Sequence, residues 1–300
     1  MLRKSVSSWL FTIATWGLYI LAWNAVSHFC KKQTGGFSVL KVQSDLLDYD
    51  RWKTPIPSAQ ISELVSQILS QPFHYMEQGG QCFAFLSDDG KYVLKLAKKR
   101  SYAFYRRLAS LPLPSFAHNI CVKKRDKAAE KIDRDCQSYQ IAYDELSDLT
   151  GIIYSHLSPL PHERYLTTIV DKIGISHTLD LNSCTFLLQK KGEPIASYLT
   201  SLEKVGDLNG CRNALRGVLY ALHTCVCRGI FDEDPGIHRN FGFAGEEPLF
   251  IDVGRFIRTE INPFPPFEKT VERFKLFLIK QHPQLLPLFD EELLRYVPKT

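Results

Sequence analysis

The 300-residue sequence lacks several features that would have indicated its class at once. Its eight cysteines form no Cys-x-x-Cys pair and are scattered through segments with core-like composition. This pattern indicates a reducing compartment rather than a disulfide framework. The sequence also has no internal repeat and no low-complexity tract. The remaining composition, 45% hydrophobic and 23% charged, is ordinary for a globular protein of one large domain or two lobes.

A strong net charge is missing too, although positive charge is concentrated in one segment. The net charge of +5 does not by itself indicate a nucleic-acid partner. Residues 98–134 contain eleven Lys and Arg against three acidic residues, a local charge of +8. Two interpretations remain open: a solvated insertion, or a surface for anionic lipid, nucleic acid or an acidic partner.

The N-terminus carries an uncharged segment of eighteen residues, 9–26, which is just long enough to span a bilayer. Arg3 and Lys4 precede it, and Lys31 and Lys32 follow it. We interpret residues 1–32 as an uncleaved membrane anchor with a helix at 9–26; a cleaved signal peptide is the alternative. The expected localisation is a single-pass membrane protein. If the main domain uses ATP, it lies in the cytoplasm.

The next part of the chain reads as a linker, 33–57, followed by a helix that Ser58 caps. Gly79 and Gly80 mark a tight turn. Asp89-Gly90 then predicts a hairpin whose second strand has Lys95 at its middle. A lysine flanked by apolar strand residues needs a partner for its ammonium group.

Two helices are predicted further along the chain. Apolar residues at helical spacing predict one over 139–157, which carries Glu145. Further strands are expected at 165–172 and 179–189. Residues 207–227 form a clear amphipathic pattern that stops at Gly229.

The most informative stretch follows Gly229. It contains Asp232 and Asp234, then Asn240, then a short apolar strand that ends at Asp252-Val253-Gly254. Phosphoryl transfer from ATP needs a carboxylate beside the acceptor hydroxyl, and an Asn and a second Asp that hold magnesium against the phosphates. A loop and the strand after it can supply all three groups.

This order of motifs resembles the protein-kinase-like superfamily, most nearly its small, divergent bacterial members. The resemblance implies an α+β, bilobal fold with an antiparallel-sheet N-lobe at 58–190 and a reduced helical C-lobe at 191–300, preceded by one transmembrane helix. The basic segment would be an insertion in the N-lobe. The implied activity is an ATP-dependent and Mg²⁺-dependent phosphotransferase.

The resemblance also implies a role for individual residues. In the N-lobe, Lys95 would bind the phosphates and Glu145 would orient it. Gly79 and Gly80 would close over the phosphates, and the backbone near Gln189 would meet adenine. In the C-lobe, Asp234 would be the catalytic base, while Asn240 and Asp252 would hold Mg²⁺.

The sequence departs from the family pattern at several points. Gly-x-Gly-x-x-Gly, His-Arg-Asp and Ala-Pro-Glu are absent, and only 46 residues follow Gly254. The step from Asp234 to Asn240 is one residue longer than usual, so Asp232 is a rival base. His238 or Arg239 can then lie in the cleft.

The short C-lobe argues against regulated protein phosphorylation and leaves a small-molecule, lipid or glycan acceptor open. A pseudokinase that only binds nucleotide, and a membrane-tethered scaffold acting through the basic insertion, are the alternatives.

Overall fold

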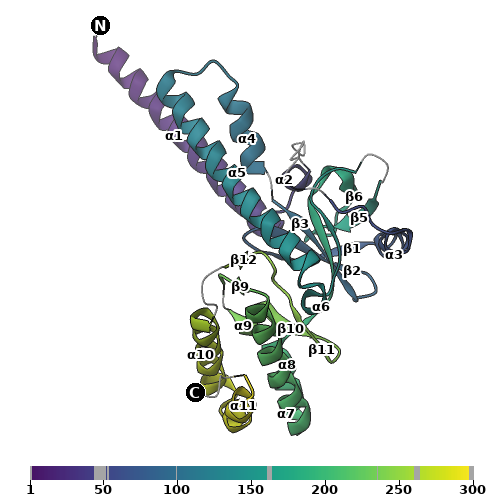
Figure 1. Cartoon of the computed structure of the whole chain (residues 1–300). Coiled ribbons are helices and arrows are strands. Elements are labelled where there is room, and N and C mark those ends of the chain that lie inside the picture. Colours follow the sequence, from purple (N-terminus) through teal and green to yellow (C-terminus); the bar gives the residue numbers. More distant parts are fainter. Residues whose placement is uncertain are drawn as a thin grey trace.

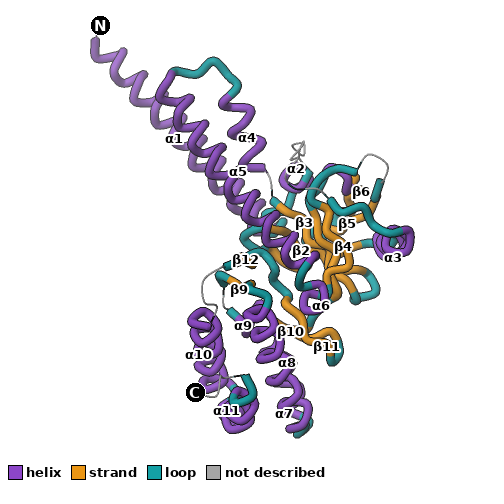
Figure 2. The backbone as a smooth tube through the Cα atoms, viewed as in Figure 1, coloured by secondary structure: helices purple, strands orange, loops and turns teal. Residues whose placement is uncertain are grey.

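The computed structural model describes residues 2–43, 52, 54–98, 100–160, 164–234, 236–259 and 264–296. Part of the expected linker, 44–51 and 53, lies outside the described residues, as does Lys99 of the basic segment. Within the described part, the chain has a mixed α+β fold: a curled sheet with helices around it, and a second, largely helical unit below (Figures 1 and 2).

The sheet unit is built on seven strands in the order β4-β7-β3-β2-β1-β5-β6. Their bounds are β1 (Phe73–Gln78), β2 (Cys82–Ser87), β3 (Tyr92–Ala97), β4 (Ile152–His156), β5 (Leu166–Val170), β6 (Ser176–Asp180) and β7 (Phe186–Lys190). Neighbouring strands run antiparallel, apart from the parallel pair β1–β5. The hairpin predicted at Asp89-Gly90 is confirmed as the β2–β3 connection, where Gly90 adopts a φ of 71°.

One hydrophobic core lies against this sheet. Alternate residues of the central strands, among them Phe83, Phe85, Leu94 and Leu96, are buried in it. Helix α3 (Ala59–Leu69) covers the core with three buried side chains, and the short α2 (Val39–Val42) adds Val42. The N-cap expected at Ser58 is confirmed, because its Oγ accepts a hydrogen bond from the N–H of Ile61 at 3.3 Å. Such a cap is worth about 1 kcal/mol.

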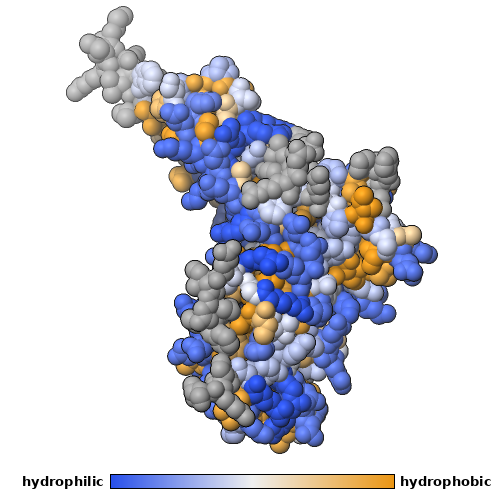
Figure 3. Space-filling view, viewed as in Figure 1, coloured by the Kyte–Doolittle hydropathy of each residue, from blue (hydrophilic) through white to orange (hydrophobic). Residues whose placement is uncertain are grey.

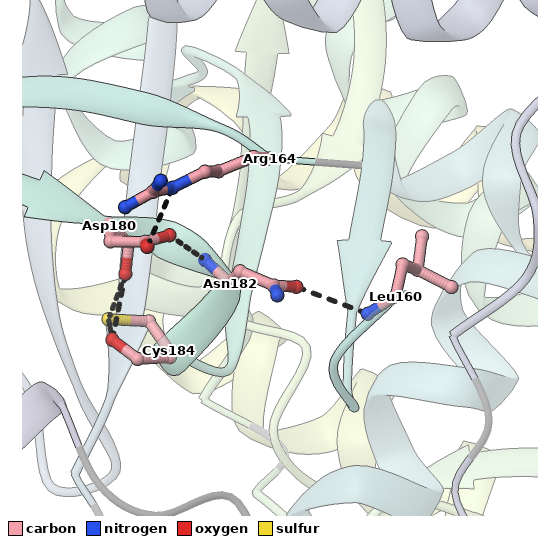
Figure 4. Close-up of polar contacts among 6 residues, drawn as sticks. Leu160, Arg164, Asp180, Asn182 and Cys184 are labelled. Carbon is pink, nitrogen blue, oxygen red and sulfur yellow. Dashed lines mark hydrogen bonds and ion pairs between the residues drawn. The ribbon is translucent and has the colours of Figure 1, made fainter. Parts of the chain in front are cut away.

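The strand expected at 179–189 is interrupted. A 3₁₀ turn, η1 (Leu181–Ser183), separates β6 from β7. Figure 4 shows the cause: Asp180 accepts hydrogen bonds from the N–H of Asn182 at 3.1 Å and from Arg164 Nε at 3.0 Å, while Asn182 Oδ1 accepts from the N–H of Leu160 at 3.1 Å. Asp and Asn side chains that bond nearby backbone groups favour turns over strands.

The basic segment forms a helical hairpin. It contains α4 (Arg100–Ala109) and most of α5 (Ser115–Asp144), which pack against each other and extend away from the sheet (Figure 1). Hydrophilic residues cover much of the face of this hairpin that Figure 3 shows. The inner end of α5 turns seven side chains into the protein, whereas its outer end is largely exposed.

The helix predicted over 139–157 is wrong in its second half. Helix α5 ends at Asp144, a single turn α6 (Ser147–Thr150) follows, and residues from Ile152 onward form β4. Gly151 adopts a left-handed φ of 59° between them. Only glycine enters this conformation at low cost, so it ends the helical turn and lets the apolar residues after it join the sheet edge.

The N-terminal helix α1 (Leu2–Gln33) contains the uncharged segment 9–26. Its described apolar side chains, such as Trp16, Leu21 and Trp23, are exposed. No helix in the part of the chain that the structure describes has the length and apolar character needed to cross a membrane. The anchor expected from the sequence is therefore not found. Within the segment, Asn24 and several Thr, Trp and Tyr residues alternate with aliphatic ones and reduce its hydrophobicity.

The helical unit contains α7 (Ile195–Lys204), α8 (Leu208–Cys227), α9 (Ile237–Asn240), α10 (Phe264–Gln281), η2 (Pro283–Leu285) and α11 (Leu286–Leu293). Two small sheets join it: β8 (Glu193–Pro194) with β10 (Phe241–Ala244) and β11 (Glu247–Phe250), and β9 (Ile230–Asp232) with β12 (Phe256–Arg258). The predicted helix 207–227 is confirmed, with Cys211, Leu215 and Val218 buried on one face. Glu292 of α11 is buried between Arg212 and Arg216 of α8 and fixes the two helices together.

Candidate functional site

The segment Ile251–Gly254 lies where the sheet unit and the helical unit meet. Lys95 Nζ of β3 donates to the carbonyl of Ile251, and Gln81 Nε2 donates to the carbonyl of Gly254 at 2.8 Å. Ser138 Oγ of α5 donates to the carbonyl of Val253 at 2.6 Å. The sheet unit thus holds three of the four residues that follow β11, on either side of Asp252.

Asn240 and Asp252 are joined from the other side. The carbonyl of Asn240 accepts hydrogen bonds from the N–H groups of Ile251 at 2.7 Å and Asp252 at 3.3 Å. The Nδ2 group of Asn240 donates to the carbonyl of Asp234 at 2.9 Å. This bond fixes the amide, so Asn240 Oδ1 is the atom left for a cation.

These donors fit magnesium. Mg²⁺ prefers oxygen ligands and is commonly held by one or two protein carboxylates together with substrate phosphates. Asn240 offers an amide oxygen, and Asp252 a carboxylate with one oxygen, Oδ1, accepting from the N–H of Gly254 at 3.2 Å. Among the described residues no three His, Cys, Asp or Glu side chains gather around a metal position.

The charges of Lys95 and Asp252 act on the same neighbour. Cys82 of β2 lies close enough to both for each charge to influence its thiol. Burial raises the pKa of Cys82 to about 11, Lys95 lowers it and Asp252 raises it. The lysine and the aspartate that the sequence singled out thus both lie near Cys82.

Two carboxylates lie at the loop before α9. Asp232, at the end of β9, accepts a hydrogen bond from the N–H of Asp234 at 2.9 Å. Burial raises the pKa of Asp232 to about 7, and the charges of Asp252 and Asp234 add to the effect. Asp234 itself is exposed, with Oδ1 3.9 Å from Arg239 Nη2. Asp234 lines a cavity of 380 Å³, whereas Asp232 lines a much smaller one of 30 Å³.

Glu145 lies elsewhere than the sequence led us to expect. It is the C-cap of α5, and its carboxylate is ion-paired with Arg258. Its backbone carbonyl accepts from Arg228. The pair with Lys95 is not formed, because the helix that should have carried Glu145 inward has ended one residue before it.

Sequence reasoning missed Asp135, a buried acid on the inner face of α5. Burial raises its pKa to about 6. Lys131, Arg134 and Arg255 oppose this shift, and Asp252 adds to it. Its Oδ1 finds no hydrogen-bond donor among the described residues. A signal was present, because Asp135 falls on the helical stripe formed by Ile132, Cys136 and Tyr139, where an acid is out of place.

Gly79 and Gly80 form the turn between β1 and β2. The N–H of Gly79 donates to the carbonyl of Cys82 at 3.1 Å. Lys98 and Lys131 donate from outside to the carbonyls of Gly79 and Gly80 respectively. The residue after this turn, Gln81, makes the contact with Gly254, so the turn is tethered directly above Asp252-Val253-Gly254. Sequence reasoning missed Gln81, since a single polar residue in a turn carries no pattern.

Gln189 is buried and links two segments of the backbone. Its Nε2 group donates to the carbonyls of Thr150 at 2.6 Å and Phe250 at 2.7 Å. The N–H groups of the next two residues are also engaged, Lys190 with Gly151 at 2.9 Å and Lys191 with Lys91 at 2.8 Å. An adenine contact at this connection remains a prediction, and these two N–H groups are already used within the protein.

Comparisons with known proteins find solved structures of low similarity. No protein-family model and no curated protein matches the chain. Rv3197 from Mycobacterium tuberculosis, solved with erythromycin, is 14% identical with a TM-score of 0.34, over 79% of this chain and 60% of that one. WbdD, a bifunctional kinase-methyltransferase, is 14% identical with a TM-score of 0.34 in its complex with a kinase inhibitor, over 75% of this chain and 46% of that one. The chain thus spans less than two thirds of either protein.

Proposed function

We propose that this chain is a bilobal, kinase-like phosphotransferase that uses ATP and Mg²⁺ and acts on an acceptor hydroxyl. The observation that supports this most is the junction at Ile251–Asp252. There Lys95 from the sheet unit donates to the carbonyl of Ile251, and the carbonyl of Asn240 from the helical unit accepts from the N–H groups of Ile251 and Asp252. A cation, an amide oxygen and a carboxylate are thereby gathered as phosphoryl transfer requires.

Each residue has a defined part in this proposal. Lys95 leaves the Ile251 carbonyl to bind the α- and β-phosphates, and the Gly79–Gly80 turn covers them. Asn240 and Asp252 hold Mg²⁺, which neutralises charge on the phosphates. Asp234 accepts the proton of the acceptor hydroxyl as its oxygen bonds to the γ-phosphorus and the bond from that phosphorus to the ADP oxygen breaks.

A nucleotide-binding module without turnover is the second candidate. One observation favours it: Glu145 is paired with Arg258, so Lys95 lacks the glutamate that the resemblance assigned to it. The third candidate, a scaffold without a nucleotide site that acts through the α4–α5 hairpin, predicts indifference to ATP.

The first prediction concerns binding. Ligand that binds only the folded state raises the melting temperature. We expect ATP with Mg²⁺ to raise that of the full chain, and ATP with a chelator to raise it much less. Asp252→Ala should abolish the magnesium-dependent part, because it removes a ligand of the ion. Asp144→Ala, an exposed aspartate on α5 away from the site, is the matched control and should behave as the wild type.

Turnover separates the first two candidates. Release of ADP from ATP that depends on Asp234, tested with Asp234→Asn, supports a phosphotransferase. Magnesium-dependent binding without ADP release supports the binding module. The absence of any shift at millimolar ATP would refute both and leave the scaffold.

A further inference from the structure

The cavity beside Asp234 has a composition that the proposed function does not explain. It lies between the loop that leads into α9 and one face of α10. We call it the anion pocket and define it by Asp234, Arg239, Arg273, Phe274, Phe277 and Lys280. Its volume of 380 Å³ is at the lower end of the range for small-molecule sites, about 300–1,000 Å³.

Positive charge dominates this pocket. Arg273 and Lys280 lie seven residues apart on α10, which places them about two turns apart on the same face. Both side chains are exposed, and neither makes an ion pair or hydrogen bond with any described residue. Arg239 adds a third cation 3.9 Å from the single carboxylate, Asp234. Three cations therefore face one anion.

His238 contributes an aromatic ring to the pocket. Its ring is stacked on Phe277 with centroids 5.2 Å apart, and Phe277 is stacked on Phe274 at 5.8 Å. The three rings form a rigid apolar wall. The pocket thus combines one apolar wall, a group of cations with unused donors, and a carboxylate at its edge.

We propose that the anion pocket binds the phosphate acceptor, and that this acceptor is a small hydroxyl-bearing molecule with an anionic group, a carboxylate or a phosphate. The assignment of Asp234 as base rests on the function proposed above. The anionic group lies on Arg273, Lys280 and Arg239, whose charged donors bind anions better than neutral donors do. The acceptor hydroxyl then points to Asp234. The apolar wall packs against the carbon skeleton.

Inorganic phosphate is the probe, because it carries the charge without requiring knowledge of the skeleton. Its affinity for the full chain is measured by calorimetry at constant ionic strength, with chloride as the replacement anion. We expect the double substitution Arg273→Gln with Lys280→Gln to weaken phosphate binding about tenfold or more, since each charge-assisted hydrogen bond contributes more than a neutral one. Lys269→Gln is the control, because Lys269 is an exposed lysine on the same helix outside the pocket.

A second variant tests whether the bound anion lies beside Asp234. Asp234→Asn removes a like charge and should strengthen phosphate binding, whereas Glu233→Gln, its exposed neighbour, should change it less. Phosphate affinity that is unchanged in the double variant, or unchanged in Asp234→Asn, would overturn the proposal.

The magnesium-ATP shift separates this inference from the proposed function. The shift should persist in the double variant Arg273→Gln with Lys280→Gln and disappear in Asp252→Ala. Phosphate binding should be weakened in the double variant and retained in Asp252→Ala. If the wild-type chain bound phosphate in the pocket but showed no melting-temperature shift with ATP, the proposed phosphotransferase activity would be refuted. An anion site beside Asp234 would remain.

Discussion

The carboxylate of Asp232 couples the site to the stability of the protein. Burial, with the charges of Asp252 and Asp234, raises its pKa from 3.8 to about 7. Between these values the folded chain holds a proton that the unfolded chain has released. The stabilising contribution of this proton is therefore present in full below pH 3.8 and is lost as pH rises through about 7. We expect the free energy of unfolding to fall less steeply with pH in Asp232→Asn than in the wild type. Urea unfolding at several pH values from 5 to 8 measures this slope.

The controls for this experiment come from other carboxylates. Asp135, whose pKa burial raises to about 6, has the same sign and leaves part of the slope in the variant. Glu292 has the opposite sign. Its hydrogen bonds to Arg216 and Arg212 lower its pKa to about 2, so its contribution is present above pH 4.5 and is lost as pH falls toward 2, outside the window. Glu233→Gln, at an exposed position, should keep the wild-type slope. An equal slope in Asp232→Asn and wild type would show that Asp232 titrates normally.

Elements whose cause is local were predictable from the sequence. The hairpin at Gly90 and helix α8 depend on turn chemistry and on a periodic apolar stripe, both of which a short window contains. The two failures have different causes, one local and one at longer range. In the sequence, the helical spacing of apolar residues that starts in α5 continues past Gly151. In the structure, the left-handed Gly151 redirects the chain into β4. The Asp180 turn likewise divides β6 from β7 through hydrogen bonds to residues about 20 positions away.

Helix α5 fixes the backbone beside the proposed metal site through one serine. Ser138 Oγ accepts from the N–H of Phe256 at 2.7 Å and donates to the carbonyl of Val253 at 2.6 Å, fully buried. We expect Ser138→Ala to lower the free energy of unfolding by about 2 kcal/mol, because it leaves a buried donor and a buried acceptor unpaired. It should also weaken magnesium-dependent ATP binding, since Asp252 is carried by the same turn.

Ser66→Ala is the comparison for this change. Ser66 is exposed on α3, where alanine is the better helix former, so the variant should be as stable as the wild type or slightly more stable. Denaturant unfolding measures both variants. If Ser138→Ala and Ser66→Ala had equal effects, the link from α5 to the Asp252 turn would not contribute to stability.

At the scale of the whole molecule, the residues of the candidate site could be proposed from sequence but their connections could not. Lys95 and Ile251 are 156 positions apart, and Gln81 and Gly254 are 173 apart. Periodicity and spacing carry no information over such separations, so the motif order suggested Lys95, Asn240 and Asp252 without showing what joins them. The same limit explains why the prediction for Glu145 differs from the structure. The motif order requires an acid on a helix, but the residue at which α5 ends decides which acid faces inward.

The two units are also joined by Gln189, whose amide spans from Thr150 beside the sheet to Phe250 of β11. The side chain is 1% exposed, so water cannot replace it easily. We expect Gln189→Leu to lower the free energy of unfolding by about 1–3 kcal/mol for each carbonyl left without a donor. Because Phe250 leads directly into Ile251 and Asp252, the variant should also loosen the junction and reduce the melting-temperature rise caused by magnesium and ATP.

Gln140→Leu, which replaces an exposed glutamine on α5, is the control for adding an apolar side chain. Denaturant unfolding and the ligand-induced shift are measured on both. A Gln189→Leu chain with lower stability but an unchanged ligand shift would show that Gln189 supports the fold without holding the two units in register.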